Sequence, residues 1–228
     1  MLTLAIETSG PLGSVALFDS PSVLGQRSLE LGRQHGQSLI PTIYQLLSSC
    51  GKQPGNLQLV AVSIGPGSYT GLRVGVVCAK TLAYAVRCPV AAVDTLHVVA
   101  CNSPADVMTV DVICDAQRGD LFVGKYCRDK SGQWVPQQSV RQVSPPVWAN
   151  ELIPTDVVSG PGLEKFHHVI EGRCRVLNGD LRRPQAEWVA RLATDAQPSG
   201  QATDLWCIEP LYLRRSSAET QWEKLHPP

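Results

Sequence analysis

A glycine-rich turn in the first half of the chain has the residue types of an anion-binding loop. It reads Gly65-Pro66-Gly67-Ser68-Tyr69-Thr70-Gly71, between an apolar run over 59–64 and a helical pattern over 71–86. A glycine turn that leads from a strand into a helix N-terminus can bind phosphate through backbone N–H groups. However, no Gly-Lys-Ser/Thr follows the glycines, and the dinucleotide fingerprint is absent. The turn therefore indicates either a ligand or partner site, or a tight strand–helix connection with close helix packing.

A second candidate site follows the first apolar run, where Glu7, Thr8 and Ser9 are adjacent. A carboxylate can hold magnesium through water, and hydroxyl and backbone N–H groups can bind phosphate. The alternative is a carboxylate at a strand end that caps a turn, and a single acid without a partner is a weak site signal. Asp94 and Asp115 could form a nuclease-like cluster with Glu7, provided that all three lie within about 4–5 Å of shared ions.

Neither the histidines nor the cysteines have the spacing of a metal site. Four residues after His35 comes Leu39 instead of a second histidine, and His167 and His168 are adjacent, so on a helix their side chains diverge. The eight cysteines contain no Cys-x-x-Cys pair, which argues against zinc. No Ser-His-Asp set has a nucleophile elbow. We therefore expect no metal site and no catalytic residues.

The composition is that of a neutral globular chain. Its 228 residues carry a formal net charge of +0 and are 43% hydrophobic, which allows a sizeable core in one large or two small domains. Strong unaided binding to nucleic acid is not expected, because it needs a basic face. The first residues do not resemble a signal peptide, and no apolar stretch is long enough to span a membrane. We expect a cytoplasmic protein.

Two helical patterns must position these candidate residues. The helix predicted over 38–50 has apolar residues at helical spacing, and the helix predicted over 71–86 is apolar on most of its surface. Such a helix is expected to pack on a sheet with one side and on another surface with the other. Small residues that repeat every fourth position would allow a second helix to approach closely; they are Gly71, Gly75, Ala79 and Ala83.

The order of predicted elements repeats in the two halves of the chain. Each half begins with three strands and then alternates helices with strands, as the apolar periodicity and the turn residues indicate. This order predicts an α/β protein with a duplicated fold, in which each of two lobes has a central mixed sheet flanked by helices. We place the N-terminal lobe at 1–103, a shortened C-terminal lobe at 104–215 and a polar tail at 216–228.

Four segments of the chain resemble the bacterial TsaB (YeaZ) family. The resemblance is strongest over residues 65–75 and extends to residues 35–43, 114–120 and 209–215. It implies a duplicated RNase H-like (actin-like ATPase) fold in shortened form. It also implies a non-catalytic subunit for tRNA N6-threonylcarbamoyladenosine modification, which binds the TsaD threonylcarbamoyl transferase and supports it together with a TsaE-type ATPase.

Further expectations depend on this resemblance. The chain would meet tRNA only through the complex, would need no cofactor of its own, and would meet ATP or ADP with magnesium only at the complex interface. Glu7, Thr8 and Ser9 would then be a vestigial nucleotide site. The two helices would form the surface for TsaD, and without TsaD this surface could pair with itself in a homodimer. The residues interpreted as this surface are His35, Leu39, Ile43, Leu46, Tyr69, Thr70, Gly71, Leu72, Arg73, Gly75, Val76, Ala79 and Ala83.

Two other classes of function remain open at this point. An actin-fold ATPase or small-molecule kinase would use Glu7, Thr8 and Ser9, and it predicts magnesium-dependent nucleotide binding by the isolated chain. Bulky Gln117 and Arg118 argue against it, since they stand where a paired phosphate turn would need glycine. The second alternative is the nuclease cluster described above.

Overall fold

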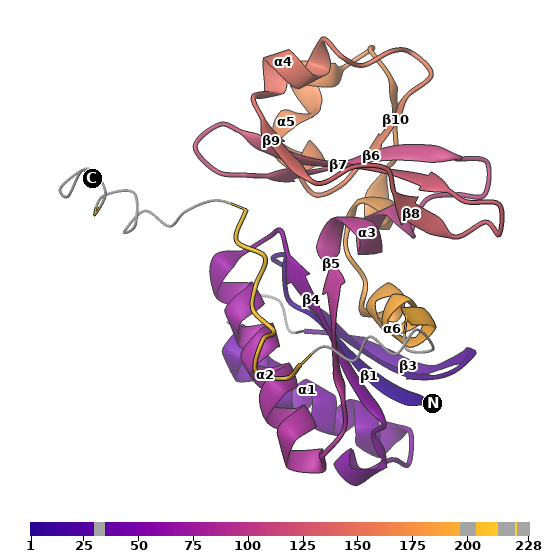
Figure 1. The fold of residues 1–228 in the computed structure, drawn as a ribbon, viewed down its shortest axis with the longest axis vertical. Helices are drawn as coiled ribbons and strands as arrows, with labels where there is room; N and C mark the ends of the chain where they lie inside the picture. Colours follow the sequence, from indigo (N-terminus) through magenta and orange to yellow (C-terminus); the bar gives the residue numbers. More distant parts are fainter. Residues whose placement is uncertain (30–34, 197–203, 214–221, 223–228) are drawn as a thin grey trace.

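The first lobe is built on a five-stranded sheet of buried apolar strands. The computed structural model describes residues 1–29, 35–196, 204–213 and 222, and Figure 1 shows its two lobes. The strand order is β3-β2-β1-β4-β5, with β1 antiparallel to β2 and parallel to β4. The edge strand β3 is the most exposed. The bounds are β1 (Leu2–Glu7), β2 (Ser14–Asp19), β3 (Ser22–Ser28), β4 (Leu59–Gly65) and β5 (Val90–Asp94).

Helices α1 (His35–Ser49) and α2 (Tyr69–Val86) cover one face of this sheet. Their buried side chains share a core with Leu4 and Ile6 of β1, whereas Ala5, which alternates with them, faces the other side of the sheet. A short 3-10 helix, η1 (Pro54–Asn56), connects α1 to β4. The two helices therefore lie side by side on one flank of the molecule (Figure 1).

The second lobe repeats the strand order of the first. Its sheet runs β11-β10-β6-β7-β8, with β9 also paired to β7. Here β6 is antiparallel to β7 and parallel to β10, as β1 is to β2 and β4. The bounds of its elements are β6 (Thr109–Asp115), β7 (Leu121–Arg128), β8 (Trp134–Pro136), β9 (Arg141–Val143), α4 (Pro145–Ala149), β10 (Val157–Ser159), α5 (Leu163–Ile170), β11 (Arg175–Val176) and η2 (Gly179–Arg182).

The last helix of each lobe packs against the sheet of the other lobe. Helix α3 (Thr95–Ala100) follows the first sheet in sequence, yet its side chains join the core of β6 and β7. Helix α6 (Ala186–Ala196) follows the second sheet, yet it packs on β1, β2 and β4, opposite α1 and α2. The predicted duplicated α/β fold is therefore confirmed. The domain bounds at 1–103 and 104–215 remain predictions, and most of the tail over 216–228 lies outside the described residues.

Candidate functional site

The turn after β1 makes several hydrogen bonds within the chain, but the second oxygen of the Glu7 carboxylate is buried without a partner among the described residues. One oxygen of the fully buried Glu7 carboxylate accepts hydrogen bonds from the backbone N–H and the hydroxyl of Ser9, at 2.6 and 2.5 Å. The hydroxyl of Thr8 donates to the carbonyl of Gly71 at 2.8 Å. Glu7 therefore caps the turn that follows its own strand, which is the second of the two interpretations that its position allowed.

Burial controls the charge of this carboxyl group. It raises the pKa of Glu7 above its ordinary value, and the nearby Ser63 side chain, the hydrogen bonds from Ser9 and the His35 ring partly offset that rise. The imidazole of His35 lies 2.8 Å from the carbonyl of Gly10 through Nε2, so this nitrogen carries the proton and donates. His35 thus ties the start of α1 to the turn after β1.

The glycine-rich turn closes over the turn after β1. Ser68 N donates to the carbonyl of Ser9 at 2.7 Å, and the hydroxyl of Ser68 caps α2 by accepting from Gly71 N. A side-chain carbon on Gly67 would lie 2.6 Å from the Ser9 carbonyl, and one on Gly71 would lie 2.1 Å from the Thr8 carbonyl. These glycines are thus required by close approach to the chain's own backbone. The geometry is that of a tight strand–helix connection.

The corresponding turn of the second lobe is also held internally. Gln117 and Arg118 both adopt left-handed backbone angles, and Asp115 accepts from Gln117 N and forms an ion pair with Lys165 at 3.0 Å. Within the described part of the chain, no three His, Cys, Asp or Glu side chains lie together as a metal site would require. Glu7, Asp94 and Asp115 therefore do not form the cluster that a two-metal nuclease needs.

Most residues interpreted as partner-facing are buried in the core of the first lobe, and this interpretation is corrected for them. The stripe of small residues on α2 faces β1 and β4 instead of solvent; a side-chain carbon on Gly75, for example, would lie 2.2 Å from the Thr8 hydroxyl. The physical reason is that the helix approaches its own sheet closely. The buried residues are Leu39, Ile43, Leu46, Gly71, Leu72, Gly75, Val76, Ala79 and Ala83. Tyr69, Thr70 and Arg73 are exposed and His35 is half-buried, and their partner role remains a prediction.

Apolar residues also lie on the exposed faces of α1 and α2, on the side of each helix that points away from the sheet. Ile40 and Tyr44 project from α1, and Val77 and Tyr84 project from α2. Their spacing of four and seven residues places each pair on one face of its helix. On α2 this second apolar phase agrees with the second packing surface that the sequence predicts. On α1 the signal of Ile40 and Tyr44 was missed, because the buried phase is more regular.

The segment 204–213 lies along α2 (Figure 1), and side chains of the two line a groove. Lys80 Nζ donates to the carbonyls of Trp206 and Ile208, at 3.2 and 3.1 Å. Arg73 donates to the Tyr212 hydroxyl at 2.9 Å and lies 4.0 Å above the centre of the Tyr69 ring. The groove has a volume of about 550 Å³ and is largely apolar. We call this groove, together with the exposed faces of α1 and α2, the helix surface.

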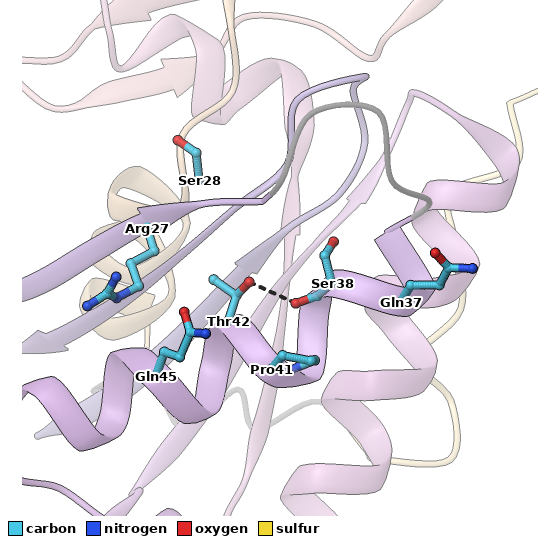
Figure 2. A pocket seen from close by; sticks show the side chains of 7 residues that line it. All are labelled: Arg27, Ser28, Gln37, Ser38, Pro41, Thr42 and Gln45. Atoms are coloured by element: carbon cyan, nitrogen blue, oxygen red, sulfur yellow. Dashed lines mark hydrogen bonds between the residues drawn. The ribbon is translucent and has the colours of Figure 1, made fainter.

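A smaller hollow lies between β3 and α1 (Figure 2). It has a volume of about 210 Å³. Figure 2 shows that Ser28 and Gln37 point in different directions, away from a common centre, and that the Thr42 hydroxyl bonds to the Ser38 carbonyl. Such side chains do not converge on a ligand, so this hollow is not a candidate site.

The repeated sheet order and the exchanged helices define a two-lobed protein of the actin-like class. In this chain the Thr8 hydroxyl and one oxygen of the Glu7 carboxylate are hydrogen-bonded to the chain itself. A family model described as "TsaD: tRNA N6-adenosine threonylcarbamoyltransferase" matches residues 29–135. The solved structure of YeaZ from Pseudomonas aeruginosa superposes with a TM-score of 0.81 and 25% identity, over 93% of this chain and 99% of that one.

Two curated relatives are similar over nearly their whole length. The tRNA threonylcarbamoyladenosine biosynthesis protein TsaB of Bacillus subtilis is 31% identical, over 97% of this chain and 98% of that protein. The protein of the same name from Escherichia coli is 28% identical, over 99% of this chain and 98% of that protein. The chain therefore belongs to the TsaB family.

Proposed function

We propose that the chain acts in tRNA threonylcarbamoyladenosine biosynthesis as a non-catalytic subunit that binds a TsaD-like transferase. Its full-length similarity to TsaB proteins supports the pathway. The observation that carries the subunit role is the helix surface, where several large apolar side chains are exposed on one flank. Contiguous exposed apolar surface on a globular protein is typical of a protein interface.

The internal use of the Glu7, Thr8 and Ser9 groups supports the absence of an independent nucleotide site. Their hydrogen bonds are made to each other and to Gly71. We therefore propose that ATP or ADP with magnesium binds only at an interface between the chain and the transferase. It further includes a TsaE-like ATPase as a second partner, contact with tRNA only through the complex, a homodimer through the helix surface when the transferase is absent, and a cytoplasmic location.

Replacing Val77 with aspartate should weaken binding to the cognate TsaD-like protein by at least about tenfold. Val77 is 62% exposed on α2 and lines the groove. A charge there would have to lose its hydration within an apolar interface, while in the free chain it stays in water. Titration calorimetry with the purified partner measures the effect, and the unfolding midpoint of the variant should match that of the unaltered chain.

Val147→Asp is the matched control, since Val147 is 57% exposed and lies on α4 of the second lobe, away from the helix surface. This control should bind the transferase with unchanged affinity. Equal affinity of Val77→Asp and the unaltered chain would refute the helix surface as the interface.

The isolated chain should show no stoichiometric heat with ATP and magnesium in titration calorimetry. The carboxylate that would hold the ion through water is fully buried and already accepts two hydrogen bonds. The same titration after addition of the TsaD-like protein tests whether a nucleotide binds to the complex. Clear one-to-one binding by the chain alone would instead support the ATPase or kinase alternative.

A further inference from the structure

A polar pocket of about 310 Å³ lies on the outer face of the second lobe, away from the helix surface. Strands β6 and β7 form its base, and the segment around α4 forms its wall. Val123, Leu152 and the almost fully buried Trp148 give it an apolar side. Its charged lining residues are Asp111, Lys125, Arg141, Glu151 and Asp156.

Asp111 is the most deeply buried acid of this pocket. Its side chain is on β6 and only 7% of the residue is exposed. Lys125 stands opposite it on β7, in register across the two strands. Within the described part of the chain, neither the Asp111 carboxylate nor the Lys125 ammonium group makes a hydrogen bond or an ion pair.

The other charged groups of the pocket have partners, although the Nε–H of Arg141 is buried without one among the described residues. Arg141 donates two hydrogen bonds to the Glu151 carboxylate and forms an ion pair with it. The Asp156 carboxylate accepts a hydrogen bond from Ile153 N at 2.9 Å. Among the described residues, the pocket therefore offers one acid and one base without a hydrogen bond or ion pair, and one guanidinium N–H without an acceptor, close to an apolar wall.

The Asp111 carboxylate lines the pocket, and its oxygens are not among the enclosed, unpartnered polar atoms of the described residues, so they can accept hydrogen bonds from water or from a ligand in the pocket. A metal ion would need further ligands, and the described residues contain no group of three that could hold one. A small organic zwitterion fits better, because its ammonium group can pair with Asp111 and its carboxylate with Lys125. We propose that this pocket binds a free α-amino acid whose side chain packs against Val123, Trp148 and Leu152.

The charge state of Asp111 agrees with this assignment. Burial raises the pKa of its carboxyl group to about 6, Asp156 and Glu151 add to the rise, and Lys125 and Arg141 oppose it. The group is thus ionised near neutral pH and can receive an ammonium group. Affinity should fall as the pH is lowered below about 6, because a protonated Asp111 no longer attracts a cation.

The test is a thermal unfolding experiment on the full chain with each of the twenty standard amino acids. At about 20 mM ligand and about pH 7.5, at least one should raise the unfolding midpoint by about 2 °C or more. Asp111→Asn should abolish that rise, and Lys125→Gln should reduce it. Asp106→Asn removes an exposed acid that pairs with Arg175 elsewhere, so it should keep the full rise.

Two analogues of the stabilising amino acid distinguish a zwitterion site from a simple charge site. The amine that lacks the carboxylate and the acid that lacks the ammonium group should each give less than half of the rise. The proposal is overturned if none of the twenty amino acids stabilises the chain, if Asp111→Asn responds like the unaltered chain, or if the amine alone is as effective. If no amino acid stabilises the chain, Asp111 pairs with Lys125 or with water instead of with a ligand.

Discussion

Replacing Gly71 with alanine is expected to lower the free energy of unfolding by about 3 kcal/mol, because this position has no room for a side chain. A β-carbon there would lie 2.1 Å from the carbonyl oxygen of Thr8 and 3.3 Å from the Ser68 side chain. The contact atom on Thr8 is backbone, which cannot rotate away. The Thr8 hydroxyl also donates a hydrogen bond to the Gly71 carbonyl, and this bond holds the two turns together.

The matched control is Gly36→Ala on α1. A β-carbon at Gly36 would meet only a Val74 methyl group, at 4.0 Å. Alanine is a better helix former than glycine, so this variant should be as stable as the unaltered chain or slightly more stable. Urea denaturation, followed by the loss of helical signal, measures both. Equal stability of Gly71→Ala and the unaltered chain would mean that the glycine turn does not pack as tightly as we describe.

The glycine turn also shows what periodicity can and cannot predict. The repeat of small residues correctly indicated close helix packing, but it could not say whether the approaching surface was another molecule or the chain's own sheet. On α1, Leu39 and Ile43 follow one helical phase and Ile40 and Tyr44 follow another. Both phases are apolar, and only tertiary packing decides which one is buried.

The fold was predictable because its strands and turns are marked locally. Apolar runs give the strands, and the repeated element order gives the two lobes. The exchange of α3 and α6 between lobes had no such signal, since it depends on which sheet offers a complementary surface. For the helix over 184–196, the sequence suggests an apolar stripe of Trp188, Val189 and Leu192. Val189 is buried against the first sheet, and Trp188 and Leu192 pack there partly buried, but the small residues Ala186, Ala190 and Ala193 make up the rest of the buried face.

The candidate sites were predictable to different degrees. The adjacency of Glu7, Thr8 and Ser9 identified a turn whose polar groups matter, but the sequence could not show that Gly71 and Ser68 would take up those groups. The Asp111 pocket was missed. Its signal was a carboxylate in the middle of an apolar strand, where a charge is unusual unless it is paired.

Replacing Asp111 with asparagine is expected to stabilise the ligand-free chain at neutral pH, by about 2–3 kcal/mol. Burial raises the pKa of the carboxyl group from its ordinary value of 3.8 to about 6 in the folded chain. Between these values the folded chain holds the proton more tightly than the unfolded chain, so folding stability falls as the pH rises. Above about pH 6 the folded chain carries the cost of a buried charge that Lys125 and Arg141 only partly offset, and asparagine removes that cost.

The pH dependence separates this effect from ordinary packing changes. The advantage of Asp111→Asn over the unaltered chain should be near zero below about pH 4, grow between about pH 4 and 6, and stay constant above that range. Asp106→Asn should show the opposite sign, because Arg175 lowers the pKa of the exposed Asp106. Urea unfolding of the three proteins across this range measures the difference. If asparagine at position 111 destabilises the chain at every pH, the carboxylate has a donor inside the folded protein, and the unpaired acid on which the amino-acid site depends does not exist.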